Sequence, residues 1–481
     1  MVDNLMKVAE KTLKLNNIKD EIEKASVSLN GKKPSAREKL MLLFDEGTFI
    51  EVGAFVKQRP VELFENSVIS ANEGVICGYG SVDGKLSFAF CQDASILKGS
   101  ISEMHAQKIV NIIEMAYKAN APIISILDSY GVRLKEGIDA LAGYGKILAA
   151  FNKINGEILH ICIVSGVCAG VLSFIPTIAD YVVMVKDAEL FLNSPDVIQS
   201  RFMEENVGTA EVAYKNGLIS EICEDDKEAV IKTKSFLTLM CEAPLNDDNI
   251  NRQTFEIENI LENLEYDVLD IIKSIADDGK ITELFGGYAK NIVTAIISMN
   301  SLTIGVIANQ NMVNSGNLDA AASKKASKFI DFCTCMDMPI LTLVDTNGFC
   351  AEKYENIEES SYLFSSYINT EVPKVTLILR KAYGSGYISM CSKVSGADFI
   401  MALPTAQIAI LPSMTGSIFM YDKHIAASEN PIIDRKTFEE QYIETYTNPY
   451  EAAKRGLIDD IIDPKTTRQL LISTFEMLLD K

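Results

Sequence analysis

The stretch IISILDSYGVR (123–133) returns much later in the chain as ILTLVDTNGF (340–349), with the same order of residue types. Each begins with an apolar run of strand length and continues with Asp, two residues and Gly. This pattern predicts a buried strand that ends in a tight turn. The two aspartates, Asp128 and Asp345, lie 217 positions apart. The same strand-to-turn junction is therefore predicted twice in the chain.

Other segments repeat at nearly the same offset. IADYVVMV (178–185) matches GADFIMAL (396–403), and Gly99 matches Gly316 at an offset of 217. Several separate matches at one offset predict an internal duplication. We place the first domain at 1–250 and the second at 251–481.

Apolar runs of strand length alternate with amphipathic helical runs in the first half. This alternation predicts an α/β fold with parallel strands and right-handed crossovers. A charged helix is expected at the start of the chain, over 4–26. The expected strands are 86–92, 122–128 and 159–165, the expected helices are 102–120 and 139–154, and PTIADYVVMV (176–185) should be a short helix entering a strand.

Composition excludes several classes of protein. The formal net charge of −21 over 481 residues argues against nucleic acid or an anionic membrane as the main partner. The ten cysteines contain no C-x-x-C pair, so no metal site is predicted. Without a secretory signal at its start, the chain is expected to be cytoplasmic. The most apolar stretch, 158–185, contains His, Pro and Asp, which favours a buried strand, turn and helix over a membrane span.

The turns suggest chemistry carried by the backbone. Each half offers two glycine-containing turns, DSYGVR and SGVCAG in the first and DTNGF and AYGSGY in the second. Two such turns can aim N–H donors at one oxygen and so form an oxyanion hole. Any one of them alone could be an ordinary tight turn. The three histidines are interpreted as structural, and no phosphate-binding loop is present.

Several longer motifs resemble the carboxyltransferase subunits of biotin-dependent acyl-CoA carboxylases and decarboxylases. This family includes acetyl- and propionyl-CoA carboxylases and methylmalonyl-CoA decarboxylase. The resemblance covers essentially the whole chain after residue 30. The motifs are KKPSAREKLMLLFDEGTFIEVGAF (32–55), SEMHAQKIVNIIEMAYKANAPIISILDSYGVRLKEGIDALAGYG (102–145), SGNLDAAASKKASKFIDFC (315–333), VPKVTLILRKAYGSGY (372–387) and NPYEAAKRGLIDDIID (448–463).

The resemblance implies two tandem crotonase-like (ClpP/crotonase) domains, the first on the acyl-CoA side and the second on the biotin side. Biotin would be attached to a separate biotin carboxyl carrier protein, with acyl-CoA as substrate and no metal. Further partners would be a biotin carboxylase or a membrane decarboxylase subunit, and the chain would form a homo-oligomer, expected to be a hexamer. Carboxyl transfer would pass through enolates, one stabilised in each half.

The resemblance also implies site residues. The thioester hole would use backbone N–H groups of Val132, Gly170 and Val171, and the biotin hole those of Gly348, Phe349, Ser385 and Gly386. Substrate contacts are expected at Gly131, Ala169 and Ile388. CoA also needs cations, and Lys98, Arg133 and Lys135, which lie near the first-half turns in the sequence, are the candidates for its phosphates. Arg380 and Lys381 precede the second hole and are further candidates.

Two alternatives stay open. One is a crotonase-like enzyme that acts on a CoA thioester without biotin and uses Glu136 or Asp139 as acid or base. The other is a non-catalytic assembly subunit, which is suggested by unusual residues at the turns. These are Tyr130, Val171, Asn347 and Ile388, where the family usually has Gly, Gly, Pro and Asp.

Overall fold

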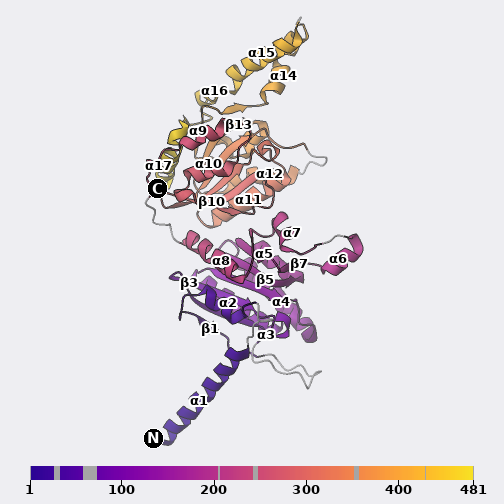
Figure 1. The fold of residues 1–481 in the computed structure, drawn as a ribbon, viewed down its shortest axis with the longest axis vertical. Helices are drawn as coiled ribbons and strands as arrows, with labels where there is room; N and C mark the ends of the chain where they lie inside the picture. The colour runs from indigo at the N-terminus through magenta and orange to yellow at the C-terminus, as the bar shows by residue number, and fades with distance from the viewer. Residues whose placement is uncertain are drawn as a thin grey trace. The chain divides into compact units, whose positions relative to one another are not determined.

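The chain divides into two compact units, Met1–Cys241 (unit 1) and Glu242–Lys481 (unit 2). The boundary expected from the sequence, between residues 250 and 251, lies a few residues further along the chain. The computed structural model describes residues 2–25, 33–57, 73–203, 206–241, 248–351, 357–427 and 430–479. Each unit is an α/β domain, as predicted (Figure 1).

The described residues of unit 1 form a mixed eight-stranded sheet of order β1-β2-β3-β4-β5-β6-β8, and β7 pairs with β5. The pairs β1–β2 and β2–β3 are antiparallel, and the strands from β3 onward are parallel. The strands are β1 Ile50–Val52, β2 Val75–Val82, β3 Lys85–Gln92, β4 Ile123–Ser129, β5 His160–Ala169, β6 Tyr181–Val185, β7 Glu189–Phe191 and β8 Glu221–Cys223. The helices are α1 Val2–Ala25, α2 Ala36–Leu43, α3 Glu103–Ala119, α4 Gly137–Ile154, α5 Phe174–Ile178, α6 Pro195–Phe202, α7 Ala210–Lys215 and α8 Asp226–Cys241.

Unit 2 repeats this topology in its described residues, with the order β9-β10-β11-β12-β13-β14-β16 and β15 paired with β13. The predicted duplication therefore extends to strand order and direction. The strands are β9 Thr282–Leu284, β10 Ile292–Met299, β11 Leu302–Asn309, β12 Ile340–Thr346, β13 Lys374–Tyr383, β14 Phe399–Ala402, β15 Gln407–Ala409 and β16 Asp460–Ile461. The helices are α9 Phe255–Leu261, α10 Val268–Ile275, α11 Ala320–Cys335, α12 Ile357–Asn369, α13 Gly384–Ser389, α14 Ser413–Ala426, α15 Pro431–Tyr442, α16 Pro449–Lys454 and α17 Thr467–Leu479.

The predicted elements of unit 1 are confirmed, with boundaries shifted by a few residues. Helix α3 begins where the Ser102 hydroxyl accepts the N–H of His105, and it ends at Asn120 in the left-handed conformation. The apolar stretch 158–185 contains β5, a short turn, α5 and β6, as expected. No helix among the described residues is long and apolar enough to cross a bilayer.

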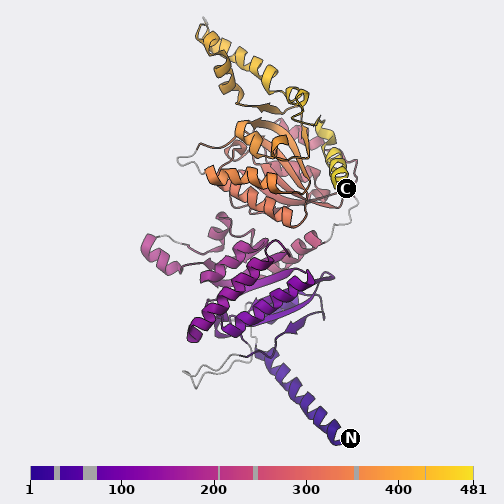
Figure 2. The ribbon, with the colours of Figure 1, turned by 180° about the vertical axis from the view of Figure 1, so that it is seen from behind.

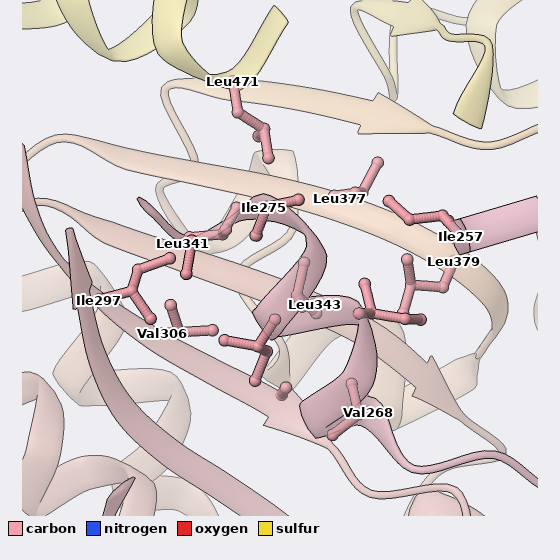
Figure 3. Packing of buried hydrophobic residues seen from close by; sticks show 14 of the residues in the cluster. Ile257, Val268, Ile275, Ile297, Val306, Leu341, Leu343, Leu377, Leu379 and Leu471 are labelled. Carbon is pink, nitrogen blue, oxygen red and sulfur yellow. The ribbon is translucent and has the colours of Figure 1, made fainter. Parts of the chain in front are cut away.

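The core of unit 2 lies between one face of its sheet and three helices (Figure 3). Leu341 and Leu343 of β12, and Leu377 and Leu379 of β13, are two residues apart and therefore point to the same face. Figure 3 shows these leucines against Val268 and Ile275 of α10, with Ile257 of α9 and Leu471 of α17 closing the layer. Alternation in the strands and helical spacing in α10 thus fix which face is buried.

Helices α14 and α15 form a hairpin that extends away from the sheet of unit 2 in both views (Figures 1 and 2). Several of its large apolar side chains are exposed, among them Phe419 at 75% and Ile432 at 88%. Apolar side chains gathered on a projecting element are typical of a surface that binds a ligand or another chain.

A short left-handed turn, η2 Leu97–Gly99, precedes α3 and recurs as η6 Asn314–Gly316 before α11. Its three residues have φ of 48°, 56° and 62° in unit 1, and 50°, 52° and 71° in unit 2. Such runs are rare for non-glycine residues. Different side chains thus follow the same backbone path in the two units.

Candidate functional site

In the junction turn of unit 1, the bridge to a neighbouring segment fixes the direction of one backbone N–H, that of Val132. Val132 forms an isolated parallel bridge with Ile101, whose N–H donates to the Gly131 carbonyl at 2.9 Å and whose carbonyl accepts the Arg133 N–H at 2.8 Å. In a parallel pair, the residue between these two bonds turns its own N–H to the opposite side. Because Ile101 follows β3, the Val132 N–H faces the side of β4 on which β5 lies.

Unit 2 builds the same arrangement around Phe349. Leu318 donates to the Gly348 carbonyl at 2.9 Å and accepts the Cys350 N–H at 2.7 Å, and Phe349 is bridged to Leu318. Leu318 follows β11, so the Phe349 N–H faces the side of β12 on which β13 lies. Val132 and Phe349 are therefore equivalent donors, 217 positions apart.

The glycine of each junction is required by its conformation. Gly131 has φ of 100° and Gly348 has φ of 121°, which other residues rarely adopt. The Gly131 N–H donates to the Ser129 hydroxyl, and the Gly348 N–H donates to the Thr346 hydroxyl, both at 3.1 Å. The Gly348 amide is thus engaged within its own turn, which leaves Phe349 as the donor on this side of the predicted biotin hole.

The second predicted turn of each unit follows the next strand. In unit 1 it is η4 Gly170–Ser173, at the end of β5, and a Cβ built on Gly131 would lie 3.8 Å from the Ala169 carbonyl oxygen. In unit 2 it is the start of α13, where Ser385 and Gly386 lie in the first turn. The first N–H groups of a helical turn have no partner within it and are suited to bind anions.

The two turns of unit 2 make close contact. A Cβ built on Gly386 would lie 2.9 Å from the Gly348 Cα and 2.8 Å from Thr346 Cγ2, so only glycine fits there. One built on Gly348 would lie 3.6 Å from the Ser385 hydroxyl oxygen and 3.9 Å from the Gly386 nitrogen. The structure therefore brings together the residues predicted for the second hole.

The predicted cations behave differently from one another. Arg133, expected at substrate, is buried and donates through Nη1 to both carboxylate oxygens of Glu73, at 3.1 and 2.8 Å, and to Glu136 at 3.2 Å. These ion pairs neutralise the guanidinium and brace the junction turn, and a contact of Arg133 with substrate stays a prediction. Burial raises the pKa of the Glu73 carboxyl, and the Arg133 guanidinium opposes this shift.

The other predicted cations lie in different environments. Lys98 is exposed, and its ammonium lies 5.1 Å from the centre of the Tyr130 ring. Lys135 is exposed on the short turn η3 Leu134–Glu136. Arg380 is engaged with the buried carboxylate of Asp345 at 3.1 Å and with the carbonyls of Asn263 and Leu264. Lys381, on β13, is half-buried, whereas the side chains of Lys98 and Lys135 are exposed.

An apolar cavity of about 810 Å³ opens beside the second turn of unit 2. Ile388, expected at substrate, lies on α13 at its wall and is 44% exposed. The hairpin α14–α15 supplies part of the lining through Phe419, Met420 and Tyr442. The sequence did not predict this cavity, because its walls come from segments that lie far apart in the chain.

The other candidate groups are structural. Burial lowers the pKa of His105 and of His160 to about 3, so both rings are neutral. His105 lies between Gln92 and the Glu73 carbonyl, and His160 stacks on Phe151. Among the residues described, no group of three or more His, Cys, Asp or Glu side chains is placed to hold a metal ion.

Comparison with known proteins gives a consistent picture. A family model described as the carboxyl transferase domain matches residues 29–481. The chain is 36% identical to the methylmalonyl-CoA decarboxylase subunit alpha of Propionigenium modestum, over 100% of this chain and 96% of that protein. It is 35% identical to the human mitochondrial propionyl-CoA carboxylase beta chain, over 93% of this chain and 86% of that one.

A solved structure matches almost the whole chain. The crystal structure of transcarboxylase 12S, described as a hexamer assembly with methylmalonyl-coenzyme A and methylmalonic acid bound, has a TM-score of 0.90 and 34% identity. The match covers 98% of this chain and 95% of that one. On sequence, extent and fold together, this chain belongs to the carboxyl transferase family.

Proposed function

We propose that this protein transfers a carboxyl group between a short acyl-CoA and biotin held on a separate carrier protein. The observation that carries the proposal is the pair of equivalent donors, the Val132 and Phe349 amides, each facing a second glycine-containing turn. A reaction with two oxyanionic partners needs two such sites.

The acyl-CoA side is assigned to unit 1. Removing a proton or a carboxyl group from the α-carbon of a thioester leaves an enolate, whose negative charge lies largely on the thioester oxygen. The amides of Val132, Gly170 and Val171 are the donors proposed for that oxygen. Loss of one such donor typically costs about 2.7–4 kcal/mol of activation free energy. Lys98, which is exposed close to the same junction, is the proposed cation for CoA.

The biotin side is assigned to unit 2. The Phe349, Ser385 and Gly386 amides are the donors proposed for the ureido oxygen, and the apolar cavity beside α13 fits a ring system with an aliphatic tail. When bound, biotin would supply the ureido nitrogen that carries the carboxyl group. Ile388, at the cavity wall, is proposed to contact the ligand bound in this cavity.

The relatives suggest the substrate and the assembly. Their names include methylmalonyl-CoA decarboxylase and propionyl-CoA carboxylase, and the transcarboxylase structure is described as a hexamer. We propose propionyl- or methylmalonyl-CoA ahead of acetyl- or malonyl-CoA as substrate, and a cytoplasmic homo-hexamer. Its partners would be a biotin carboxyl carrier protein and either a biotin carboxylase or a membrane decarboxylase subunit.

The first experiment is to incubate the purified protein with methylmalonyl-CoA, and separately with malonyl-CoA, with and without excess free biotin. The decarboxylated CoA product is followed by chromatography. Biotin-dependent product is expected with methylmalonyl-CoA. Product that forms equally well without biotin would contradict carboxyl transfer and favour an enzyme that acts on the thioester alone.

A variant pair tests the biotin side specifically. Gly386→Ala places a methyl group against Thr346 and Gly348, so the two turns must separate. We expect biotin-dependent transfer to fall about 100-fold or more while the dissociation constant for the CoA thioester is unchanged. The control is Gly145→Ala, an exposed helical site with open space around the added methyl group. Equal activity of the two variants would contradict the assignment of unit 2.

A further inference from the structure

The turn that carries Gly170 and Val171 is held by the hydroxyl group of Tyr144. This hydroxyl donates to the Ala169 carbonyl at 3.0 Å and accepts the Leu172 N–H at 2.5 Å. One oxygen atom thus joins the residue before the two amides to the residue after them. The link spans 25 to 28 positions of sequence, so it ties the turn to a different element.

The element that carries Tyr144 is firmly held. Tyr144 lies on α4 and is 3% exposed. Its neighbour Gly143 packs so closely on α3 that an added Cβ would lie 3.0 Å from the Ala106 Cβ. Burial raises the pKa of the Tyr144 hydroxyl, so it stays protonated and can donate one hydrogen bond while it accepts the other.

The hydroxyl uses one amide of the turn and leaves its neighbours available. The first three N–H groups of a helical turn, here those of Gly170, Val171 and Leu172, have no partner within the turn. Tyr144 takes the third. In unit 2, the amides at the start of α13 donate to no side-chain hydroxyl among the residues that the structure describes.

We infer that Tyr144 is a positioning residue that fixes the direction of the Gly170 and Val171 amides toward the thioester oxygen. The inference rests on the function proposed above and goes beyond it by naming what sets the geometry of the first hole. Tyr144 itself touches neither substrate nor reacting atoms. Without the Tyr144 hydroxyl, the turn loses both hydrogen bonds. Amides whose direction is not fixed before the reaction stabilise the transition state less, whereas binding of the substrate changes little.

The test is Tyr144→Phe, which removes one oxygen atom and keeps the ring. The matched control is Tyr181→Phe, because Tyr181 is equally buried in unit 1 and donates its hydroxyl to Glu221, on a different strand, at 2.7 Å. With methylmalonyl-CoA and free biotin, we expect kcat to fall about tenfold to a hundredfold in Tyr144→Phe. KM and the directly measured dissociation constant of the CoA thioester should stay within about twofold of wild type. Tyr181→Phe should keep kcat within about twofold.

Equal kcat in the two variants overturns the inference, and so does a Tyr144→Phe loss that appears only in KM. Hydrogen exchange supplies a second readout that does not depend on activity. The Leu172 amide of the wild-type protein should exchange slowly, and faster in Tyr144→Phe at unchanged melting temperature. If the variant does not fold, fast exchange at Leu172 in the wild type would by itself contradict the link. An inactive wild type would instead count against the proposed function.

Discussion

The carboxylate of Asp128 accepts the backbone N–H of Val167 at 3.2 Å, across a point where the register of β4 and β5 shifts by two residues. In unit 2, Asp345 accepts the Lys381 N–H at 3.1 Å, across the same shift between β12 and β13. Such a bulge leaves an amide without a ladder partner. The aspartate of each junction therefore accepts the N–H of a residue in the bulge. The bulge in turn sets where the end of the next strand lies at the site.

The two caps should differ in their effect on stability. Asp345 is fully buried and also binds Arg380, Tyr266 and Asn311, so Asp345→Asn leaves a largely buried guanidinium without its countercharge. We expect the free energy of unfolding to fall by about 3–5 kcal/mol. Asp128→Asn, which keeps an oxygen acceptor, should cost about 1–2 kcal/mol. Urea unfolding of both variants measures this, and equal losses would contradict it.

The left-handed turn before α3 should not tolerate a side chain at its third residue. A Cβ on Gly99 would lie 2.2 Å from the Asp128 carbonyl oxygen, so Gly99→Ala must displace the junction. We expect a loss of about 3–5 kcal/mol of stability together with loss of transfer activity. Gly84→Ala, with φ of 80° and open space, isolates the backbone strain and should cost about 1 kcal/mol. Thermal unfolding of the two variants, compared side by side, checks the difference.

Glu136 and Asp139 should not act as the acid or base of a CoA-only reaction. Glu136 already accepts the Glu103 N–H at 3.0 Å and binds Arg133, and Asp139 is exposed at the start of α4. We expect Glu136→Gln and Asp139→Asn to keep kcat within about threefold of wild type, since a general acid or base typically contributes about 10²–10⁴-fold. A hundredfold loss in either variant would revive the biotin-independent alternative.

Acid should destabilise unit 1 through its buried histidines. Burial lowers the pKa of His160 to about 3, against about 6.5 in an unfolded chain. Between about pH 3 and 6.5, the unfolded chain therefore binds a proton at His160 that the folded protein does not bind. The stability this gives is complete above about pH 6.5 and falls as pH drops toward 3. At pH 5 the loss is about 2 kcal/mol for this histidine. Urea midpoints at pH 7.5 and 5.0 should therefore differ less in His160→Gln than in wild type, whereas His424→Gln, at an exposed site, should behave as wild type.

The fold could be predicted from the sequence because its signals are local and repeated. The mostly apolar run at 122–128, the helical spacing within 102–120 and the matched glycines each depend on a few neighbouring residues. The offset of 217 then indicated that one topology occurs twice.

The details of the site depend on partners distant in sequence. The ion pair of Arg133 with Glu73 joins residues 60 positions apart, so it leaves no local pattern in the sequence. The same holds for Tyr144 and for the cavity of unit 2. One feature of the site did have a signal in the sequence. Ser129 and Thr346 stand two residues before the junction glycines, and their hydroxyls accept the N–H groups of Gly131 and Gly348. A hydroxyl residue at both positions could have indicated that these two amides are engaged within the turn.

The matching left-handed turns have a consequence for how the two halves could diverge. Leu97 and Lys98 in one half stand where Asn314 and Ser315 stand in the other, yet the dihedral angles are nearly the same. The two halves share the backbone conformation of this turn and differ in the side chains that it carries. An ancestral half of this kind could keep its means of holding a negative charge while each descendant changed its preferred ligand. Specialisation could then proceed by ordinary side-chain substitution, without rebuilding the machinery beneath.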